Sequence, residues 1–298
     1  YLGNNENPYL VLVDVIDTAA SEFNISVSCQ IIYDSACNSC SNLTTIDVPE
    51  GVISIGTSAF NNCISLATVT FAGDSQLASI GNSAFINCSS LTEITLPASL
   101  TSIGSRVFFN SSGSIKIYYQ GTIDQWLNMT FGSNWLSDNN INLYINDELA
   151  DEITINADIP SYAFQGIDSI TKVTLGEGVT SIGRDAFSGC SGLTEITLSA
   201  SITSIGNYAF SGCSSLTEIT LPASVTSIGD HAFYDCSNLT EIYYQGTIVQ
   251  WLNMTFGRVW NTDNNTNLYI NDELVDEITI NADIPSYAFY SIDSITKV

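Results

Sequence analysis

Basic residues are scarce in this chain of 298 residues. Lys and Arg number 6 against 31 Asp and Glu, and with one histidine the formal net charge is -25. Such a chain has no basic surface that could neutralise phosphates, so we expect neither nucleic acid nor an anionic membrane surface as a partner. Charged residues are nevertheless 12% and hydrophobic residues 45% of the sequence, a balance that differs from that of disordered chains.

Long apolar runs and catalytic motifs are also missing. No apolar run approaches the ~20 residues of a membrane-spanning helix, so we expect no membrane insertion. The sequence has no Gly-x-Ser-x-Gly elbow, no Walker loop and no glycine-rich dinucleotide turn. The single histidine, His231, stands where other copies of the repeat described below carry serine, arginine, aspartate or tyrosine, which is typical of a solvated surface side chain. We predict that the chain is not an enzyme and holds no cofactor.

What the chain does contain is a repeat. Ser-Ile-Gly occurs at Ser54, Ser79, Ser102, Ser181, Ser204 and Ser227. An Ala-Phe pair follows in five of these units, and a cysteine stands three residues after its phenylalanine. Intact units are 23 residues apart, with one spacing of 25. Self-similarity at this period indicates a solenoid.

Each unit has the pattern of two short strands and a turn. Residues 216–222 alternate apolar and polar side chains as a half-buried strand does, and a proline closes the segment. Residues 225–229 form a second extended piece that ends at a glycine suited to a positive φ. Residues 232–236 predict a tight turn or one helical turn. Because no unit closes a core alone, the units must stack, and the sequence predicts a mainly β, right-handed solenoid of parallel strands.

The repeat resembles a known family. The pattern L-x-x-I-x-L-P-x-x-[VIL]-T-S-I-G-x-x-A-F-x-x-C-x-x-L is similar to the BspA-like leucine-rich repeats of bacterial and protist surface proteins, and the similarity covers nearly all of residues 25–298. It implies a non-enzymatic, extracellular or cell-surface protein that acts in adhesion or cell contact. The chain departs from the pattern at Cys37, in the Phe position, and at Ser111, in the Cys position.

We expect one continuous leucine-rich repeat solenoid domain with an internal duplication. An N-terminal β-hairpin block at 1–24 precedes repeats at 25–116 and 153–241, inserts with a hairpin and a short helix at 117–152 and 242–277, and a truncated repeat at 278–298. The segment 117–173 returns almost unchanged 125 residues later. Because the copy stops where the original continues into further repeat sequence, we expect the chain to belong to a longer protein.

The eight cysteines do not predict a disulfide framework. Five occupy the same inward position of their units: Cys63, Cys88, Cys190, Cys213 and Cys236. Strands of neighbouring coils lie ~4.8 Å apart with parallel Cβ vectors, which does not suit a disulfide, so we predict buried thiols. Cys29, Cys37 and Cys40 lie in the irregular first unit, where a pairing stays open. Cys37 and Cys40 have no second such pair and no histidine nearby, so we predict no metal site there.

All four tryptophans lie in the inserts. Trp126, Leu127 and Phe131 have the spacing of one face of a short helix, which Thr122 is suited to cap. The first interpretation of these aromatic residues is core packing beneath a hairpin, and the second is stacking on sugars. Of the four, we expect Trp135 and Trp260 to be the exposed pair and therefore candidate partner-binding residues.

The second candidate surface is the sheet. The two residues that flank the central isoleucine of each long strand point outward, onto what we expect to be the concave side of the solenoid. This face is threonine-rich, flat and polar, with no deep pocket. Its candidate partner-binding residues are Glu93, Tyr118, Glu195, Glu218, Glu241 and Tyr243.

Three of these glutamates form a row. Glu195, Glu218 and Glu241 take the same outward position in successive coils, which places like charges about 5 Å apart, and Lys172 offsets one end. One interpretation is that the side chains spread into solvent and are screened by salt. The other is that the row attracts a hard divalent cation such as Ca²⁺, or a basic patch on a partner.

Two classes of function follow. The first is an adhesion module that binds a protein or glycan on a host or neighbouring cell through the sheet face or the inserts. The second is a structural spacer or filament-forming segment that associates end to end with further copies of itself. A monodisperse monomer favours the first, and concentration-dependent polymers favour the second.

Overall fold

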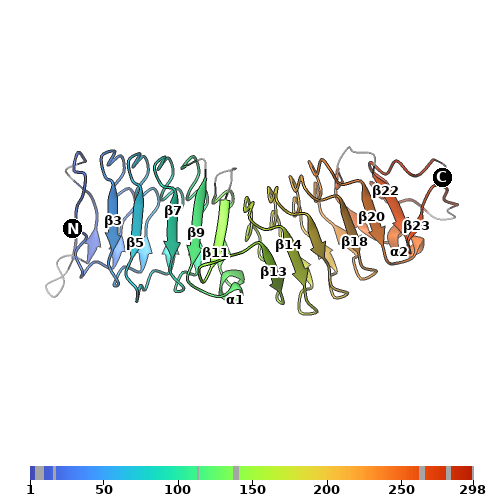
Figure 1. Ribbon diagram of the computed structural model, residues 1–298, viewed down its shortest axis with the longest axis horizontal. Coiled ribbons are helices and arrows are strands. Elements are labelled where there is room, and N and C mark those ends of the chain that lie inside the picture. Colours follow the sequence, from blue (N-terminus) through green and yellow to red (C-terminus); the bar gives the residue numbers. More distant parts are fainter. Residues whose placement is uncertain are drawn as a thin grey trace. The chain divides into compact units, whose positions relative to one another are not determined.

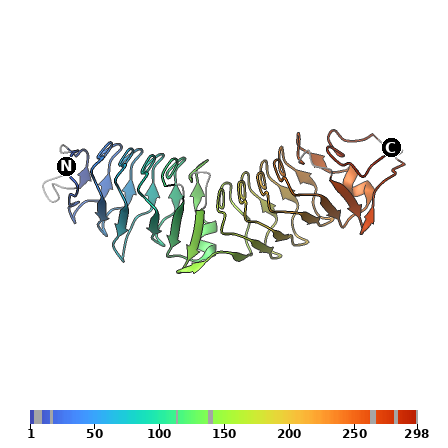
Figure 2. The ribbon, with the colours of Figure 1, turned by 45° about the horizontal axis from the view of Figure 1, so that its top comes forward.

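The computed structural model describes residues 1–3, 10–15, 18–112, 114–136, 141–261, 266–279 and 283–296. They form two compact units, Tyr1–Ala150 and Asp151–Val298 (Figure 1). Each unit is a stack of coils, and each coil gives one strand to a row of long strands and one to a row of short strands (Figure 2). The mainly β solenoid fold is therefore confirmed, whereas a single continuous domain stays a prediction.

In the first unit the long strands are β3 (Thr45–Val48), β5 (Thr68–Phe71), β7 (Glu93–Leu96), β9 (Ile115–Tyr119) and β11 (Ile141–Ile145). The short strands are β1 (Val11–Leu12), β2 (Ile31–Ile32), β4 (Ser54–Ile55), β6 (Ser79–Ile80), β8 (Ser102–Ile103) and β10 (Thr130–Phe131). The short strands form one parallel sheet. A helix, α1 (Ile123–Leu127), and the antiparallel strand β12 (Glu148–Leu149), which pairs with β11, complete the insert.

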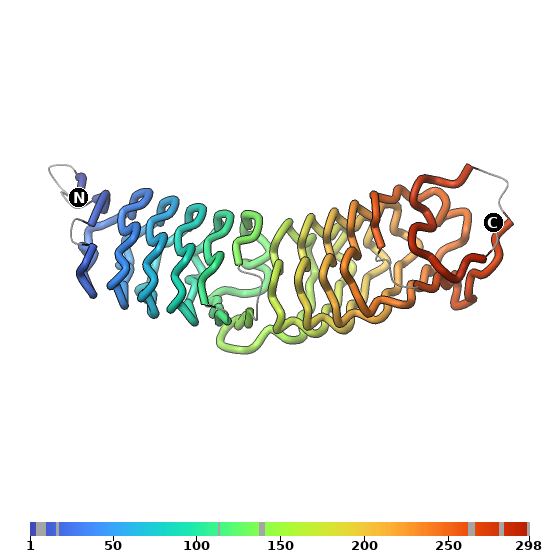
Figure 3. The backbone as a smooth tube through the Cα atoms, turned by 90° about the horizontal axis from the view of Figure 1, so that it is seen from above, coloured from blue at the N-terminus to red at the C-terminus, as the bar shows by residue number. Residues whose placement is uncertain are grey.

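The second unit repeats this plan. Its long strands are β13 (Glu152–Ile155), β14 (Lys172–Leu175), β16 (Glu195–Thr197), β18 (Glu218–Leu221), β20 (Glu241–Tyr244) and β22 (Asn267–Ile270). Its short strands are β15 (Ser181–Ile182), β17 (Ser204–Ile205), β19 (Ser227–Ile228) and β21 (Thr255–Phe256). The second insert contributes α2 (Ile248–Leu252) and β23 (Glu273–Leu274), which pairs antiparallel to β22. The tube view shows the successive coils of each unit side by side (Figure 3).

The core of each unit is built from columns of identical residues, because parallel in-register pairing places the same repeat position of each coil over its neighbour. The phenylalanines stack with ring centroids 5.2 to 5.7 Å apart and are fully buried. The columns are Phe60, Phe85 and Phe108 in the first unit and Phe164, Phe187, Phe210 and Phe233 in the second.

The cysteine column is confirmed as buried thiols. All eight cysteines are buried and outside any disulfide, including Cys29, Cys37 and Cys40, whose pairing the sequence left open. Each repeat thiol donates to a carbonyl of the preceding coil, as Cys213 Sγ does to Phe187 O at 3.2 Å. Ser111 makes the same bond with its hydroxyl, to Phe85 O at 3.0 Å. Ser111 therefore replaces the thiol donor at this position, whereas Ile167 fills it in the coil of Phe164 without any donor.

The glycine of Ser-Ile-Gly has a different purpose from the one expected. A Cβ on Gly206 would lie 2.7 Å from the carbonyl carbon of Gly183 in the preceding coil, so close backbone stacking requires glycine. The positive φ falls two residues later, at Ser58, Ser83, Arg106, Asp185, Tyr208 and His231, with values of 52 to 57°. The predicted positive φ at the glycine is therefore wrong, whereas the tight turn that follows is confirmed.

Candidate binding face of the long-strand sheets

The outward-facing residues of the long strands lie where the repeat predicts. In β18, Ile219 is 1% exposed, whereas Glu218 is exposed and Thr220 half-buried. Glu93 and Tyr118 stand on this face in the first unit, and Glu195, Glu218, Glu241 and Tyr243 in the second. The structure therefore brings the six sheet candidates together as two groups, one in each unit.

Each unit also carries a stacked pair of tyrosines on this face. Tyr118 stacks on Tyr144 of β11 with centroids 4.6 Å apart, and Leu149 of β12, which is 43% exposed, lies opposite Tyr144. Together these three residues form the first Tyr-Tyr-Leu row. This row of two half-buried tyrosines and one exposed leucine stands out on a face that is otherwise polar.

The second unit has an equivalent row. Tyr243 stacks on Tyr269 of β22 at 4.7 Å, and Leu274, which is 49% exposed, lies opposite Tyr269. Sequence reasoning missed the second tyrosine and the leucine of each row. In Leu-Tyr-Ile the alternation of side chains along a strand places the tyrosine on the outer face. The sequence does not show that this tyrosine meets another, because that depends on the pairing of β11 with β9 and of β22 with β20.

Tyr243 is held by the acidic neighbour on its own strand. Its hydroxyl donates to Glu241 Oε2 at 2.6 Å, and this hydrogen bond raises the pKa of Tyr243 to about 12. In the first unit, Lys116 takes the position of Glu241, two residues before Tyr118. The two rows thus share their apolar part and differ in the charge beside it.

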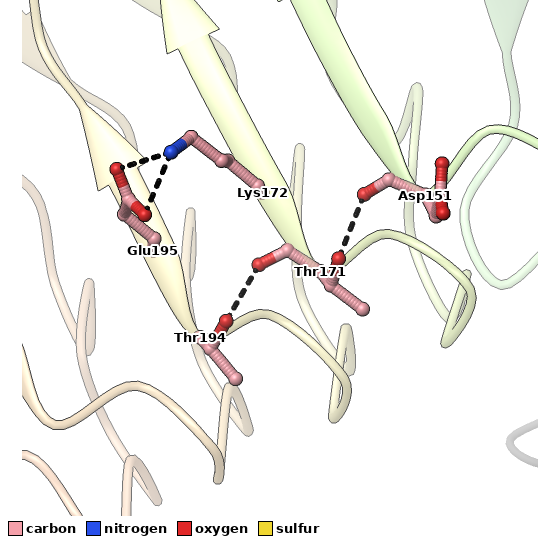
Figure 4. Close-up of polar contacts among 5 residues, drawn as sticks. All are labelled: Asp151, Thr171, Lys172, Thr194 and Glu195. Carbon is pink, nitrogen blue, oxygen red and sulfur yellow. Dashed lines mark hydrogen bonds and ion pairs between the residues drawn. The ribbon is translucent and has the colours of Figure 1, made fainter.

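Two of the three carboxylates in the acidic row have partners on the sheet. Glu195 is bound by Lys172 Nζ at 2.9 Å (Figure 4), and this hydrogen bond raises the pKa of Lys172. Glu241 is bound by Tyr243, and Glu218 lies beside Glu241 in register. Within the described ranges, no group of three or more His, Cys, Asp or Glu could hold a metal ion. The Ca²⁺ hypothesis thus gains no support from this arrangement of carboxylates and stays a prediction.

Proline interrupts the ladder of the long strands. The residue after a long strand usually donates its N–H to the preceding coil: Ala72 to Val48, Gln120 to Leu96, Gly176 to Ile155 and Gln245 to Leu221. Pro97 and Pro222 take this position after β7 and β18 and have no N–H to donate. In the part of the chain that the structure describes, β7 does not pair with β5, and β18 does not pair with β16.

A cleft opens at the second of these interruptions. It has a volume of about 540 Å³ and is lined by Thr194–Leu198, Thr217, Glu218, Thr220 and Gln245. We call it the β16–β18 cleft. Leu198, in its wall, is half-buried, whereas Leu175 and Leu221 in the same repeat position are buried. The expectation of a flat face without a pocket is therefore wrong here, because a proline replaced a ladder donor.

A row of hydrogen bonds joins the N-terminal ends of the long strands and stops at the β16–β18 cleft. Thr171 Oγ1 donates to Asp151 O at 3.1 Å and Thr194 Oγ1 to Thr171 O at 3.0 Å (Figure 4). Among the described residues, Thr217 continues neither this side-chain bond nor the backbone bond to Thr194. In the described part of the chain, the carbonyl of Thr194 thus reaches the cleft without the ladder partner that Thr171 O and Thr217 O have in the neighbouring coils.

The tryptophans belong to the core. Trp135 and Trp260 are both 0% exposed, so their prediction as exposed partner-binding residues was wrong. Trp135 O accepts a hydrogen bond from Phe108 N at 2.8 Å. Ala84 O accepts the same bond from Phe60 N in the coil before it, so Trp135 takes a core position of the next coil. Trp260 Nε1 donates to Tyr287 O at 2.7 Å. The core-packing interpretation was the correct one.

The helix predicted in the insert is present but shorter than expected. Thr122 caps α1, its Oγ1 accepting from Gln125 N at 3.2 Å while Gln125 Oε1 accepts from Thr122 N. Trp126 lies on the helix, whereas Phe131 lies on β10. Both are buried against each other, with ring centroids 5.1 Å apart.

His231 is not the solvated side chain that we expected. It is half-buried and stacks on Tyr208 at 4.8 Å, with Tyr234 edge-on at 5.4 Å. The Arg184 guanidinium lies over the ring of Tyr208, 5.4 Å from its centroid. The turn positions of adjacent coils stack just as the strands do, which is why a histidine there gains aromatic neighbours.

The sequence matches a family model along most of its length. The model of the BspA type leucine rich repeat region, in six copies, covers residues 17–137 and 157–296. The chain belongs to the BspA type leucine-rich repeat family. No curated protein matches it. The core columns described above are the recurring positions of this BspA type repeat.

A solved structure shares the solenoid fold. The crystal structure of the pneumococcal vaccine antigen PcpA matches with a TM-score of 0.53 and 24% identity, over 84% of this chain and 60% of the antigen. This chain thus spans 60% of the antigen's length. A leucine-rich repeat protein from Eubacterium ventriosum matches with a TM-score of 0.49 and 20% identity, over 97% of this chain and 89% of the other. The described residues include no helix long and apolar enough to cross a membrane.

Proposed function

We propose that this chain is a non-enzymatic binding module of a surface or secreted protein. It adheres to a protein or glycan on a host or neighbouring cell through the outer face of its long-strand sheets. The observation that carries the proposal is the Tyr-Tyr-Leu row on that face in each unit, Tyr118, Tyr144 and Leu149 in the first.

The physical argument rests on contact area. A tyrosine pair offers a large, rigid surface with a polar tip, at little entropic cost, and such residues dominate binding energy in interfaces. The stacking partner and the sheet hold each ring in place before a ligand arrives, so Tyr118 and Tyr243 lose little freedom on binding. Polar and acidic side chains around the rows provide the rim that such a contact needs.

The family supports the proposed location. The pneumococcal protein of similar fold is described as a vaccine antigen, which agrees with a surface or secreted role for this chain. The strong negative charge of this chain disfavours anionic partners and favours neutral or basic ones.

The test is a binding screen of the full chain against extracellular-matrix proteins and a glycan array. For each ligand found, the Tyr118→Ala, Tyr243→Ala and double variants are compared with Thr45→Ala and Thr68→Ala, which change exposed residues of the same face. We expect a loss of affinity of about tenfold or more in the double variant, the size of a hot-spot truncation.

Unchanged binding in the double tyrosine variant, with normal folding by circular dichroism, would remove the rows from the proposal. Sedimentation of the parent chain addresses the alternative function. Concentration-dependent polymers in place of a monomer would favour a structural spacer that associates end to end.

A further inference from the structure

The β16–β18 cleft differs from the rest of the sheet in its free acceptors. In the coils on either side, Thr171 O accepts from Thr194 N at 2.9 Å, and Thr217 O accepts from Thr240 N at 3.0 Å. The described residues give the carbonyl of Thr194 no such donor across the cleft. A carbonyl that has lost its ladder partner gains from any donor that enters.

The cleft is also electronegative on both walls. Glu195 stands on one wall and Glu218 on the other, and Glu241 lies beside Glu218 in register. Lys172 partly compensates Glu195. Glu218 has no basic neighbour of this kind in the described part of the sheet, since its own ladder partner is a glutamate. The charge of the cleft therefore favours a cation.

We infer that the β16–β18 cleft receives an arginine side chain of a protein partner. This inference rests on the proposed function as a binding module and names the class of partner at that face. The guanidinium fits because it carries five N–H donors in a planar fork and no acceptor. It can thus bond Glu218, Glu195 and the Thr194 carbonyl together, and the cavity of about 540 Å³ is large enough to admit it.

Other cations fit the cleft less well. A lysine ammonium concentrates three donors on one atom and does not span two walls. A calcium ion needs about six to eight oxygen ligands in close contact, and no metal-holding group of carboxylates or histidines lies within the described ranges. The spread of acceptors over two strands is what selects a planar, forked donor.

Pro222 keeps the cleft open. It stands after β18, where Gln245 after β20 donates to Leu221 O at 2.9 Å. An alanine at this position supplies the missing N–H, which can bond Leu198 O and extend the ladder across the gap. Pro222→Ala therefore closes the site without touching a carboxylate.

The experiment uses the full chain, labelled with ¹⁵N, and a blocked peptide, acetyl-Gly-Arg-Gly-amide, as the probe. Acetyl-Gly-citrulline-Gly-amide, which has the same length and no charge, is the control peptide. We expect the arginine peptide to shift the amide signals of Ile196, Thr197 and Thr220, and the citrulline peptide to leave them unchanged.

Two variants localise the effect. Glu218→Gln and Pro222→Ala should each weaken the binding of the arginine peptide at least fivefold. The matched controls in the other unit, Glu93→Gln and Pro97→Ala, should leave it within twofold. Amide signals across the rest of the sheet report that each variant is folded.

Equal shifts with the citrulline peptide, or unchanged affinity in both Glu218→Gln and Pro222→Ala, would overturn the inference. This outcome is distinguishable from failure of the proposed function. The tyrosine rows involve different residues, so loss of ligand binding in the tyrosine variants can stand while the cleft proves empty of arginine.

Discussion

Truncation of Phe210 to alanine tests the stacked core directly. Its side chain is 0% exposed and lies between Phe187 at 5.5 Å and Phe233 at 5.3 Å, with ring planes within 6°. Removing a buried phenylalanine costs about 3 to 5 kcal/mol through lost transfer energy and the cavity that remains. Two stacked aromatic pairs, each worth about 0.5 to 1.5 kcal/mol, place the expected loss in the upper part of that range.

The measurement is urea unfolding followed by circular dichroism. Phe60 provides a comparison, because it has a stacked phenylalanine on one side, Phe85 at 5.2 Å, and Cys37 in the phenylalanine position on the other. We expect Phe60→Ala to cost about 1 kcal/mol less than Phe210→Ala. Phe210→Leu should cost about 1 to 3 kcal/mol, because it keeps most of the volume but loses both stacked pairs.

A loss below about 1 kcal/mol for Phe210→Ala would contradict burial of this side chain and with it the register of the repeat. Equal losses for Phe60→Ala and Phe210→Ala would refute the additional value given to stacking on both faces.

Three further outcomes are expected. Gly206→Ala should lower the free energy of unfolding by about 1 to 3 kcal/mol, because its Cβ meets backbone, whereas Gly73→Ala, with nothing within 4 Å, should be neutral or slightly stabilising; similar losses in both would refute the close-packing argument. Burial raises the pKa of Cys63 and Cys236 to about 12 from the ordinary 9.0. The protonated thiols therefore stabilise the fold fully below pH 9, and this contribution is lost between pH 9 and pH 12. Urea unfolding across that range should show the free energy of unfolding decline, and a flat profile would contradict the expectation. Thr122→Ala removes the α1 cap and should cost about 1 kcal/mol in the same assay, with no loss expected if the capping box is not formed.

The repeat alone determined the core. Positions such as Phe210 and Cys213 recur every 23 residues, and parallel stacking without a shift in register is the arrangement that buries every copy. The same periodicity placed Glu218 and Thr220 on the outer face, since side chains alternate along a strand. Fold, core columns and thiol state were therefore predictable from spacing.

The surface features depended on contacts between segments far apart in the sequence. Tyr118 and Tyr144 become a pair because β11 returns beside β9, which no local pattern states. Trp135 and Trp260 looked like exposed insert residues, yet the turn that carries them completes the next coil and buries them. In both cases the tertiary pairing decided which face of the strand or turn met solvent.

The effect of Pro222 depends on both the sequence and the tertiary structure. The sequence shows that Pro222 ends a strand, and chemistry shows that it has no N–H to donate. Which carbonyl loses its partner, and whether the strands separate there, depends on the coil that lies alongside. The stacking of β16 against β18 decided that the loss falls at Leu198, at one end of a cleft that Glu195 and Glu218 also line, because a ladder bond joins residues of two coils rather than neighbours in one.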